Sequence, residues 1–229
     1  MIFCKDNLKT VYSLLLHPKY LLKNNTRVFK SRIKGEKDNS LTIQDSWVSG
    51  TGITFQGTGN RIIAHDCHLF NSSLFIRGSG HSIIIESGVQ FFNVRLKIIG
   101  RNNVIHIGKN TQLGGGNIIH GGDSLTISIG SDCFLAEGFD IWSTDTHSIL
   151  EKASDESCTN SPESIHIGDH VWFGKDVTIL KGVTIGKDAV IGMKSLVTKN
   201  VQEGSLNVGI PSRQIRSGIT WNSLNPTNG

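Results

Sequence analysis

Between residues 167 and 201, apolar side chains recur at every sixth position of the chain. A large apolar residue opens each six-residue unit, at Ile167, Phe173, Ile179, Ile185, Ile191 and Val197. A small or β-branched residue takes the fifth place, at Val171, Val177, Val183, Ala189, Ser195 and Val201. An α-helix repeats every ~3.6 residues and a strand every ~2, so neither gives this pattern. A six-residue period predicts a parallel β-helix, in which each unit is a short strand and a turn. Three units would close one triangular coil, so Gly174 and Gly192, eighteen residues apart, are expected to stack.

The region before this strict repeat follows a longer and looser period. Similar segments begin at Gly59, Gly80, Gly100 and Gly122, which lie 20–22 residues apart, and each continues into a β-branched, apolar run. We expect these segments to be β-helix coils that carry extra residues at one corner. A single coil cannot bury its apolar face alone, so the stacking of successive coils must supply the core.

The strict repeat is interrupted once along the chain. It begins at Ile129, breaks after Trp142 and resumes at Ile167. The intervening residues 143–164 are polar, and we predict a loop that leaves the solenoid at one corner, where insertions commonly carry function. The β-helix domain is predicted over residues 41–221, and residues 222–229 are expected to form a flexible tail.

Composition narrows the class of protein. The chain has 229 residues, which suits one domain with a continuous core. No apolar run reaches the ~18 residues of a membrane span, and no signal-peptide pattern is present at the N-terminus. The four cysteines, Cys4, Cys67, Cys133 and Cys158, have no CxxC spacing, so neither a zinc site nor a disulfide framework is expected. These features favour a cytoplasmic protein without a bound metal.

Positive charge is concentrated in residues 1–40, which carry nine Lys or Arg against three acidic residues, within a net charge of +4. The same segment has a loosely amphipathic pattern that Pro18 interrupts. One interpretation is a helical cap over the open end of the β-helix. The other is a helical segment that contacts an anionic polymer, or the inner face of a membrane. No nucleic-acid partner is predicted.

The repeat resembles that of the hexapeptide-repeat acyltransferases, which are trimeric left-handed β-helix enzymes that use acetyl-CoA. The likeness is densest over residues 125–216. Within that family, the run from Ile129 to Ile141 and the Asp-x-His segment that follows look most like capsular polysaccharide O-acetyltransferases, including those that act on sialic-acid polymers. The resemblance therefore implies an all-β, left-handed parallel β-helix, a homotrimer, acetyl-CoA as co-substrate and a carbohydrate acceptor, with an anionic polysaccharide as one candidate.

Two residues are predicted to carry the chemistry. A sugar hydroxyl is a poor nucleophile near neutral pH, so acetyl transfer needs a base beside it, and an imidazole can accept and return that proton. His147, in Asp145-Thr-His147-Ser, matches the position of the family's catalytic histidine. Trp172, in Val171-Trp-Phe-Gly174, matches a second family segment and takes an outward position of the repeat. His120 and His170 are considered as neighbours of this site.

The resemblance also implies binding residues. Contacts to coenzyme A carry over to Lys175, Met193, Thr198, Lys199, Arg213 and Arg216. Asn117 and Trp142 are predicted to contact the acceptor. Met193 replaces a small residue of the family, and Ile210 and Ser212 depart from one common form of its Gly-Asn-Pro-Ala-Lys segment. The basic residues suit the phosphates of coenzyme A.

Other functions remain open at this point. A sugar-nucleotide or small-sugar acetyltransferase, acting on an amine or a hydroxyl, would use the same fold and the same histidine. Left-handed β-helices also include zinc-dependent carbonic anhydrases, but His147 and His170 lack a clear third histidine partner. A non-catalytic assembly scaffold is the third alternative.

Overall fold

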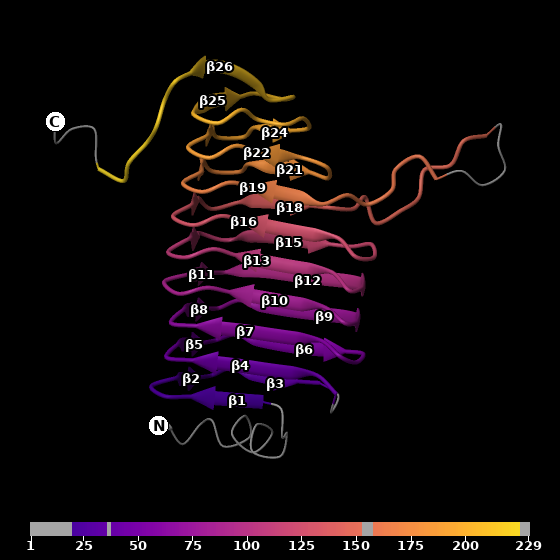
Figure 1. Ribbon diagram of the computed structural model, residues 1–229, viewed down its shortest axis with the longest axis vertical. Helices are drawn as coiled ribbons and strands as arrows, with labels where there is room; N and C mark the ends of the chain where they lie inside the picture. Colours follow the sequence, from indigo (N-terminus) through magenta and orange to yellow (C-terminus); the bar gives the residue numbers. More distant parts are fainter. Residues whose placement is uncertain (1–19, 36–37, 153–157, 225–229) are drawn as a thin grey trace.

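The computed structural model describes residues 20–35, 38–152 and 158–224. All regular elements in these ranges are strands, and they form a single parallel solenoid of three long sheets (Figure 1). The predicted all-β, left-handed β-helix is confirmed. Each coil contributes one strand to each sheet, so up to β24 each paired strand meets the strand three places further along the chain.

The strands are short and their bounds follow the coils. The first sheet contains β1 (Tyr20–Lys23), β4 (Ser40–Gln44), β7 (Arg61–His65), β10 (Ser82–Ile85), β13 (Val104–Ile107), β16 (Thr126–Ile129), β19 (Ile165–Ile167) and β22 (Thr184–Ile185). The second contains β2 (Arg27–Phe29), β5 (Trp47–Ser49), β8 (His68–Phe70), β11 (Gln90–Phe92), β14 (Gln112–Leu113), β17 (Phe134–Leu135), β20 (Trp172–Phe173), β23 (Val190–Ile191), β25 (Ser205–Val208) and β26 (Arg213–Ser217). The third contains β3 (Arg32–Lys34), β6 (Gly52–Gln56), β9 (Ser73–Ser79), β12 (Val94–Arg101), β15 (Gly116–His120), β18 (Phe139–Trp142), β21 (Thr178–Leu180) and β24 (Leu196–Val197).

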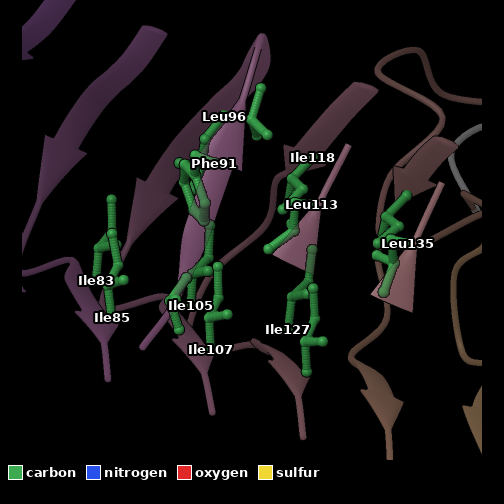
Figure 2. Close-up of a cluster of buried hydrophobic side chains, with 14 of the residues drawn as sticks. Ile83, Ile85, Phe91, Leu96, Ile105, Ile107, Leu113, Ile118, Ile127 and Leu135 are labelled. Atoms are coloured by element: carbon green, nitrogen blue, oxygen red, sulfur yellow. The ribbon is translucent and has the colours of Figure 1, made fainter. Parts of the chain in front are cut away.

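One continuous apolar core runs along the solenoid axis. Side chains alternate between the inside and the outside along each strand, so the inward residues of all three sheets meet in the centre. Figure 2 shows one stretch, where residues such as Ile83, Ile105 and Ile127 stack from coil to coil. All twelve residues that the six-residue repeat placed inside are buried, from Ile167 to Val201. Burial of these stacked side chains is the main force that holds successive coils together.

The late coils have the length that the sequence predicted. Phe173 pairs with Ile191, eighteen residues further on, and Gly174 lies against the backbone of Gly192 and Met193. The earlier coils are longer, since Arg61 pairs with Ser82 and Val104 with Thr126. Most of the extra length extends the third sheet, where β12 has eight residues whereas β24 has two.

Buried polar side chains fill the corner that follows the third sheet in the early coils. Asn39, Asn60, His81 and Asn103 occupy equivalent places in successive coils and are at most 1 % exposed. Each bonds to the backbone of the next coil, as where Asn60 Oδ1 accepts from the backbone N of His81 (3.0 Å) and Asn103 Oδ1 from that of Leu125 (2.9 Å). We name these four residues the corner ladder. The extra residues at this corner therefore satisfy buried backbone groups that the short late turns do not have.

The structure corrects the extent of the N-terminal helical segment, which was assigned to residues 1–40. Residues 20–34 hold β1, β2 and β3 and form the first coil of the solenoid. Arg32 and Lys34 point outward on either side of buried Ile33, so the positive charges here decorate strands. Residues 1–19, which carry the rest of the predicted segment, lie outside the described residues.

The opposite end of the solenoid is closed by a hairpin. β26 runs antiparallel to β25, the one antiparallel pair among the named strands of the described ranges. Residues after β26 turn back along the second sheet, so Trp221 packs beside His170. The tail thus contacts the solenoid through Thr220 and Trp221, and the residues from 225 onward lie outside the described ranges.

Candidate active site

The residues between β18 and β19 leave the solenoid as one long excursion (Figure 1). β18 ends at Trp142 and β19 begins at Ile165, and the two strands flanking the excursion still stack in register on their neighbours. The repeat therefore continues beneath the loop as if the insertion were absent. His147 lies in the outgoing part of this loop and is exposed.

A hydrogen-bonded neck ties the two arms of the loop to the solenoid. Lys181 Nζ donates to Asp145 Oδ2 (2.5 Å) and to the backbone O of Asn160 (2.8 Å). Asn160 Nδ2 donates to the same Asp145 oxygen (2.7 Å) and to the backbone O of His147 (2.8 Å). The hydrogen bonds from Lys181 and then Asn160 hold the pKa of Asp145 below its usual range. Since the Lys181 side chain is only 17 % exposed, this neck is partly shielded from solvent.

The neck fixes the backbone on which the His147 ring is mounted. Thr146 has a φ of 62°, a left-handed conformation that β-branched residues rarely adopt. Thr146 Oγ1 lies 3.1 Å from His147 Nδ1. When this hydroxyl accepts the Nδ1 proton, Nε2 carries the free lone pair and faces away from the contact. The contact with Thr146 thus involves Nδ1, and Nε2 makes no hydrogen bond within the described residues.

His120 lies under the start of the loop and has a different role from that considered in the sequence. Its side chain is 0 % exposed, with Nδ1 2.7 Å from Ser143 Oγ and Nε2 3.1 Å from the backbone O of Leu125. Burial lowers the pKa of His120 to about 4, so the ring is neutral at physiological pH. Donation from Nε2–H to Leu125 and acceptance at Nδ1 from Ser143 suit this neutral state. His120 therefore anchors the first residue of the loop.

Trp172 lies elsewhere, on the outer face of the second sheet. Its indole is 40 % exposed, as expected for an outward position of the repeat. It lines a groove of about 710 Å³ with Gln112 and Phe134 of the two preceding coils and with tail residues Trp221–Leu224. The loop with His147 leaves from the third sheet, and His147 does not line this groove. Within one chain, the two predicted catalytic residues are not brought together.

The tail completes the Trp172 groove through an aromatic stack. The rings of Trp221 and His170 are 4.5 Å apart and inclined by 9°, and Trp221 Nε1 donates to the backbone O of His170 (2.7 Å). The centroid of Trp172 lies 6.0 Å from that of Trp221. His170 Nδ1 is 2.8 Å from Asp188 Oδ1, and the hydrogen bond lowers the pKa of Asp188. His170, considered as a neighbour of the site, thus positions Trp221 beside Trp172.

The predicted coenzyme A contacts gather in the last coils. Lys199 and Arg213 line one groove of about 360 Å³, together with Ser212. The Ser212 hydroxyl is buried and has no hydrogen-bond partner in the described structure, so a polar ligand group in this groove would satisfy it. Met193 and Thr198 are exposed, Arg216 extends from β26, and Lys175 pairs with Glu137 at 3.4 Å. The charge of Lys175 is therefore partly compensated, whereas Lys199 and Arg213 make no ion pair in the described ranges.

The two predicted acceptor contacts lie on the third sheet. Trp142 is half-buried and ends β18, between Ile119 and Leu180 of the neighbouring coils. Asn117, on β15, donates from Nδ2 to Asp140 Oδ1 (2.7 Å) and lines a separate polar groove of about 430 Å³. Trp142 thus lies at the start of the loop, and Asn117 lies on the preceding strand of the same sheet, opposite Asp140.

Sequence reasoning missed Lys181, Asn160 and Trp221. Lys181 and Asn160 are 21 residues apart and meet only because the chain returns to the solenoid after the loop. No periodic signal marks such a contact. A tryptophan in the otherwise polar C-terminal segment was a usable signal for Trp221, because large aromatic side chains are seldom left in solvent.

Among residues 20–35, 38–152 and 158–224, no group of three or more His, Cys, Asp or Glu side chains is arranged to hold a metal ion. In the same ranges, no helix is long and apolar enough to cross a membrane.

The chain is similar to known proteins in both sequence and fold. Residues 164–199 match the family described as bacterial transferase hexapeptide (six repeats). The chain is 31% identical over 147 residues to the polysialic acid O-acetyltransferase of Neisseria meningitidis, covering 63% of this chain and 67% of that protein. The chain belongs to the bacterial hexapeptide transferase family. It is an acyltransferase, as the sequence predicted.

Other members of this transferase family agree over longer spans. The chain is 27% identical over 165 residues to the putative lipopolysaccharide biosynthesis O-acetyl transferase WbbJ of Escherichia coli, covering 68% of this chain and 82% of that one. The crystal structure of the polysialic acid O-acetyltransferase OatWY is 27% identical, with a TM-score of 0.79 over 87% of this chain and 93% of that one. The structure of the acetyltransferase NeuO is 23% identical, with a TM-score of 0.73 and 91% coverage of both chains, and shows the shared fold.

Proposed function

We propose that this transferase moves an acetyl group from acetyl-CoA to a sugar hydroxyl of a cell-surface polysaccharide, capsular or O-antigen, with His147 as the general base. The observation that carries the proposal is His147 itself, held on a loop whose neck is locked by Asp145, Asn160 and Lys181. Polysaccharide acceptors are supported by the named activities of the relatives, which are O-acetyltransferases of polysialic acid and of lipopolysaccharide biosynthesis.

The proton and electron pairs balance without a covalent enzyme intermediate. His147 Nε2 takes the proton of the acceptor hydroxyl, and the oxygen attacks the acetyl carbonyl to form a tetrahedral oxyanion. The C–S bond then breaks, and the thiolate of coenzyme A receives the proton from His147. Cys133 lines the Trp172 groove, but burial raises its pKa to about 11, so it stays a thiol at neutral pH. A direct transfer fits this chemistry better than a cysteine nucleophile.

Oxyanion stabilisation is assigned to the neighbourhood of Trp172 and Gly174. Backbone N–H groups aimed at a developing negative charge lower the barrier of acyl transfer strongly. The backbone N of Gly174 is already used in the coil ladder, since it donates to the backbone O of Ile191 (2.8 Å). The exposed indole N–H of Trp172 is therefore the better donor.

The phosphate end of coenzyme A is assigned to the last coils. Lys199 and Arg213 share a groove with the unpartnered hydroxyl of Ser212, and phosphate oxygens would satisfy all three. Met193, Thr198, Arg216 and Lys175 flank this end of the solenoid. Lys175 must exchange its partner Glu137 for a phosphate, so we expect it to contribute least.

A homotrimer would unite the two halves of the site. His147 is carried on a loop that extends away from its own solenoid, while Trp172 stands exposed on the second sheet. We therefore propose that the loop of one subunit reaches the Trp172 groove of its neighbour. Trp142 at the start of the loop is proposed to contact the acetylated sugar, and Asn117 in its polar groove is proposed to contact another part of the same acceptor. Residues 1–19 are proposed as a cap or a contact with an anionic membrane or polymer.

Release of free thiol from acetyl-CoA tests the proposal directly. Wild type, His147→Ala and the control His166→Ala are compared on polysialic acid, other capsular polysaccharides, neutral oligosaccharides and amino-sugar nucleotides. His166 is an exposed histidine of β19 and lies outside the loop. We expect turnover on a polysaccharide that is lost by at least a hundredfold only in His147→Ala.

Two results would change the proposal. Full activity of His147→Ala would remove this histidine from the reaction. Turnover confined to amino-sugar nucleotides or small sugars would move the enzyme to N-acetylation or small-sugar O-acetylation, which uses the same fold.

A further inference from the structure

The early coils carry a stack of aromatic rings on the outer face of the second sheet. The centroids of Trp47 and Phe70 lie 5.2 Å apart, and Phe70 stacks on Phe92 at 5.5 Å with an inclination of 14°. The ring of His68 lies 6.1 Å from Trp47 and 5.8 Å from Phe70. We name Trp47, His68, Phe70 and Phe92 the aromatic ladder. Trp47 is 45 % exposed and Phe92 37 %, so this apolar surface faces solvent in the single chain.

A polar groove begins where the aromatic ladder ends. The groove holds about 430 Å³, and its polar lining consists of Asn71, Ser73, Asn93, Arg95 and Asn117. Asn71 and Asn93 directly follow the ladder residues Phe70 and Phe92 along the chain. Both asparagines have a positive φ, of 47° and 56°, and form the corner between the second and third sheets. Aromatic rings and polar groove therefore adjoin at one corner of the solenoid.

The polar groups of this groove are available for a ligand. Within the described ranges, the exposed guanidinium of Arg95 makes no ion pair, and the amides of Asn71 and Asn93 make no side-chain hydrogen bond. Asn117 uses only its Nδ2 for Asp140, which leaves Oδ1 as an acceptor. These side chains do not bond to buried backbone groups. In the corner ladder, by contrast, each asparagine side chain accepts a hydrogen bond from a backbone N–H of the next coil.

This combination suits a sugar polymer with acidic groups. A pyranose ring has an apolar C–H face that packs on an aromatic ring and a rim of hydroxyls that bond to amides. A carboxylate on the sugar matches the planar fork of an arginine. We propose that the aromatic ladder and the polar groove form a second glycan-binding site, which holds a distant part of the anionic polysaccharide that is acetylated at His147. The inference rests on the proposed function.

The second site lies far enough from the Trp172 groove that only a polymer can occupy the two sites together. The second sheet continues without interruption from β11 through β14 and β17 to β20, which carries Trp172. Adjacent strands are ~4.8 Å apart, so Phe92 and Trp172 are separated by roughly 14 Å along the axis. A single sugar cannot bridge this distance, but a chain of several sugars can. Binding at the ladder would raise the local concentration of acceptor at the catalytic groove.

A second copy of the chain could also cover the aromatic ladder and the polar groove. The polar side chains of the groove disfavour this alternative. Arginine and aromatic residues are common in protein interfaces, so it is the polar groups of the groove without a partner in the described residues that count against a second copy. A packed subunit would desolvate Arg95 and the amides of Asn71 and Asn93 next to the rings. An acidic sugar supplies the partners that these groups require.

Binding is tested in the His147→Ala background, so that catalysis does not enter. The probes are polysialic acid, alginate and hyaluronan as anionic polymers, and dextran as the neutral one. The first variant carries both Trp47→Thr and Phe92→Thr, because threonine suits an exposed strand position. The second variant is Arg95→Gln. The matched controls are Leu21→Thr, at an exposed position of the first sheet, and Arg61→Gln, on β7. We expect at least a tenfold weaker Kd for an anionic polymer in both test variants and an unchanged Kd in both controls.

Several results would overturn the second site. Unchanged affinity in the test variants would do so, as would equal affinity for dextran, or no binding of any anionic polymer. A lower mass of the Trp47→Thr, Phe92→Thr protein in sedimentation would assign the ladder to a subunit contact. Ladder-dependent binding without acetyl transfer by wild type would contradict the proposed function alone, and acetyl transfer without ladder-dependent binding would contradict the second site alone.

Discussion

The early and late coils solve the same packing problem in different ways. From β4 to β15 the coils have 21 or 22 residues and use the buried corner ladder, Asn39, Asn60, His81 and Asn103, to turn the chain. From β19 to β24 they have 18 residues and turn tightly. At the corner after the third sheet, Gly182 turns the chain between β21 and β22 with a φ of 75°.

The difference separates two tasks within one solenoid. In the short coils, successive backbones lie close together in a repeated geometry. Trp172 and the predicted coenzyme A contacts lie on these coils. The longer coils have wider faces, and the aromatic ladder and the polar groove occupy these. The loop with His147 begins at the boundary between the two regions, where buried His120 holds Ser143.

The largest expected effect is on the corner ladder. Asn103 donates to the backbone O of Ile99 (3.0 Å) and of Gly122 (2.6 Å), and accepts from Leu125 N (2.9 Å). Asn103→Ala leaves these buried groups unsatisfied, and we expect the free energy of unfolding to fall by about 3 kcal/mol or more. Urea unfolding measures the change.

The late coils provide the control for this prediction. Asn200 accepts from Thr184 N (2.8 Å) but is exposed, so water can replace it. Asn200→Ala should cost less than about 1 kcal/mol. Equal losses for the two variants would show that the corner ladder is no more demanding than the late turns.

Acid should lower the free energy of unfolding through His120, which lies between the early and late coils. The pKa of His120 is lowered from 6.5 to about 4 by burial, so the unfolded chain binds a proton that the folded ring excludes. The contribution to stability is fully present above pH ~6.5 and is lost as the pH falls toward ~4, by about 3 kcal/mol in total.

The test compares wild type with His120→Gln in urea unfolding at pH 7 and pH 4.5. His81, whose pKa burial also lowers, is present in both proteins. The variant should lose less stability between the two pH values than wild type does. An identical loss in both proteins would contradict the assignment of acid sensitivity to His120.

The loop neck should influence turnover more than stability. Lys181→Met removes the donor that joins Asp145 to Asn160, so His147 loses its fixed backbone. Displacement of a catalytic group by about 1 Å can cost up to ~100-fold in rate, and we expect kcat to fall on the order of tenfold or more.

Lys181→Arg should recover part of the rate because a guanidinium can donate to both acceptors. The pH profile of kcat should shift in Lys181→Met, because the charges around the loop change. A fall in urea midpoint that parallels the loss of kcat, or a Lys181→Arg variant as slow as Lys181→Met, would assign Lys181 to folding alone.

The smallest expected effect is a loss of stability when a side chain is added between two closely packed late coils. A Cβ at Gly168 would lie 2.7 Å from the backbone N of Lys187, whereas a Cβ at Gly52 meets nothing within 4 Å. Gly168→Ala should destabilise the late coils by about 1–2 kcal/mol through overpacking. Gly52→Ala should be neutral or slightly stabilising, and thermal unfolding compares the two. A neutral Gly168→Ala would show that the short coils can separate without cost.

The sequence by itself determined the β-helix, because its cause is local and repeated. Ile167 and its eleven counterparts recur with a period that only stacked short strands can bury, and the eighteen-residue stacking of Gly174 on Gly192 follows from it. The sequence also predicted the break after Trp142, because a polar insertion cannot continue an apolar core. The N-terminal boundary was misjudged because Arg32-Ile33-Lys34 shows too short an alternation to reveal a strand.

The tertiary structure alone decided how the candidate site is held together. Lys181 meets Asp145 and Asn160 across the neck of the loop, and Trp221 returns from the tail to stack on His170. These contacts join residues 21 to 51 positions apart, and at least one residue of each contact lies outside the six-residue repeat, so the period does not predict them. The contacts between coils in the aromatic ladder differ in this respect: they join rings 21 to 23 residues apart, close to the length of one coil, and form when the coils stack. A repeat fixes where each residue stands along the solenoid, while the partners across its surface depend on the folded chain.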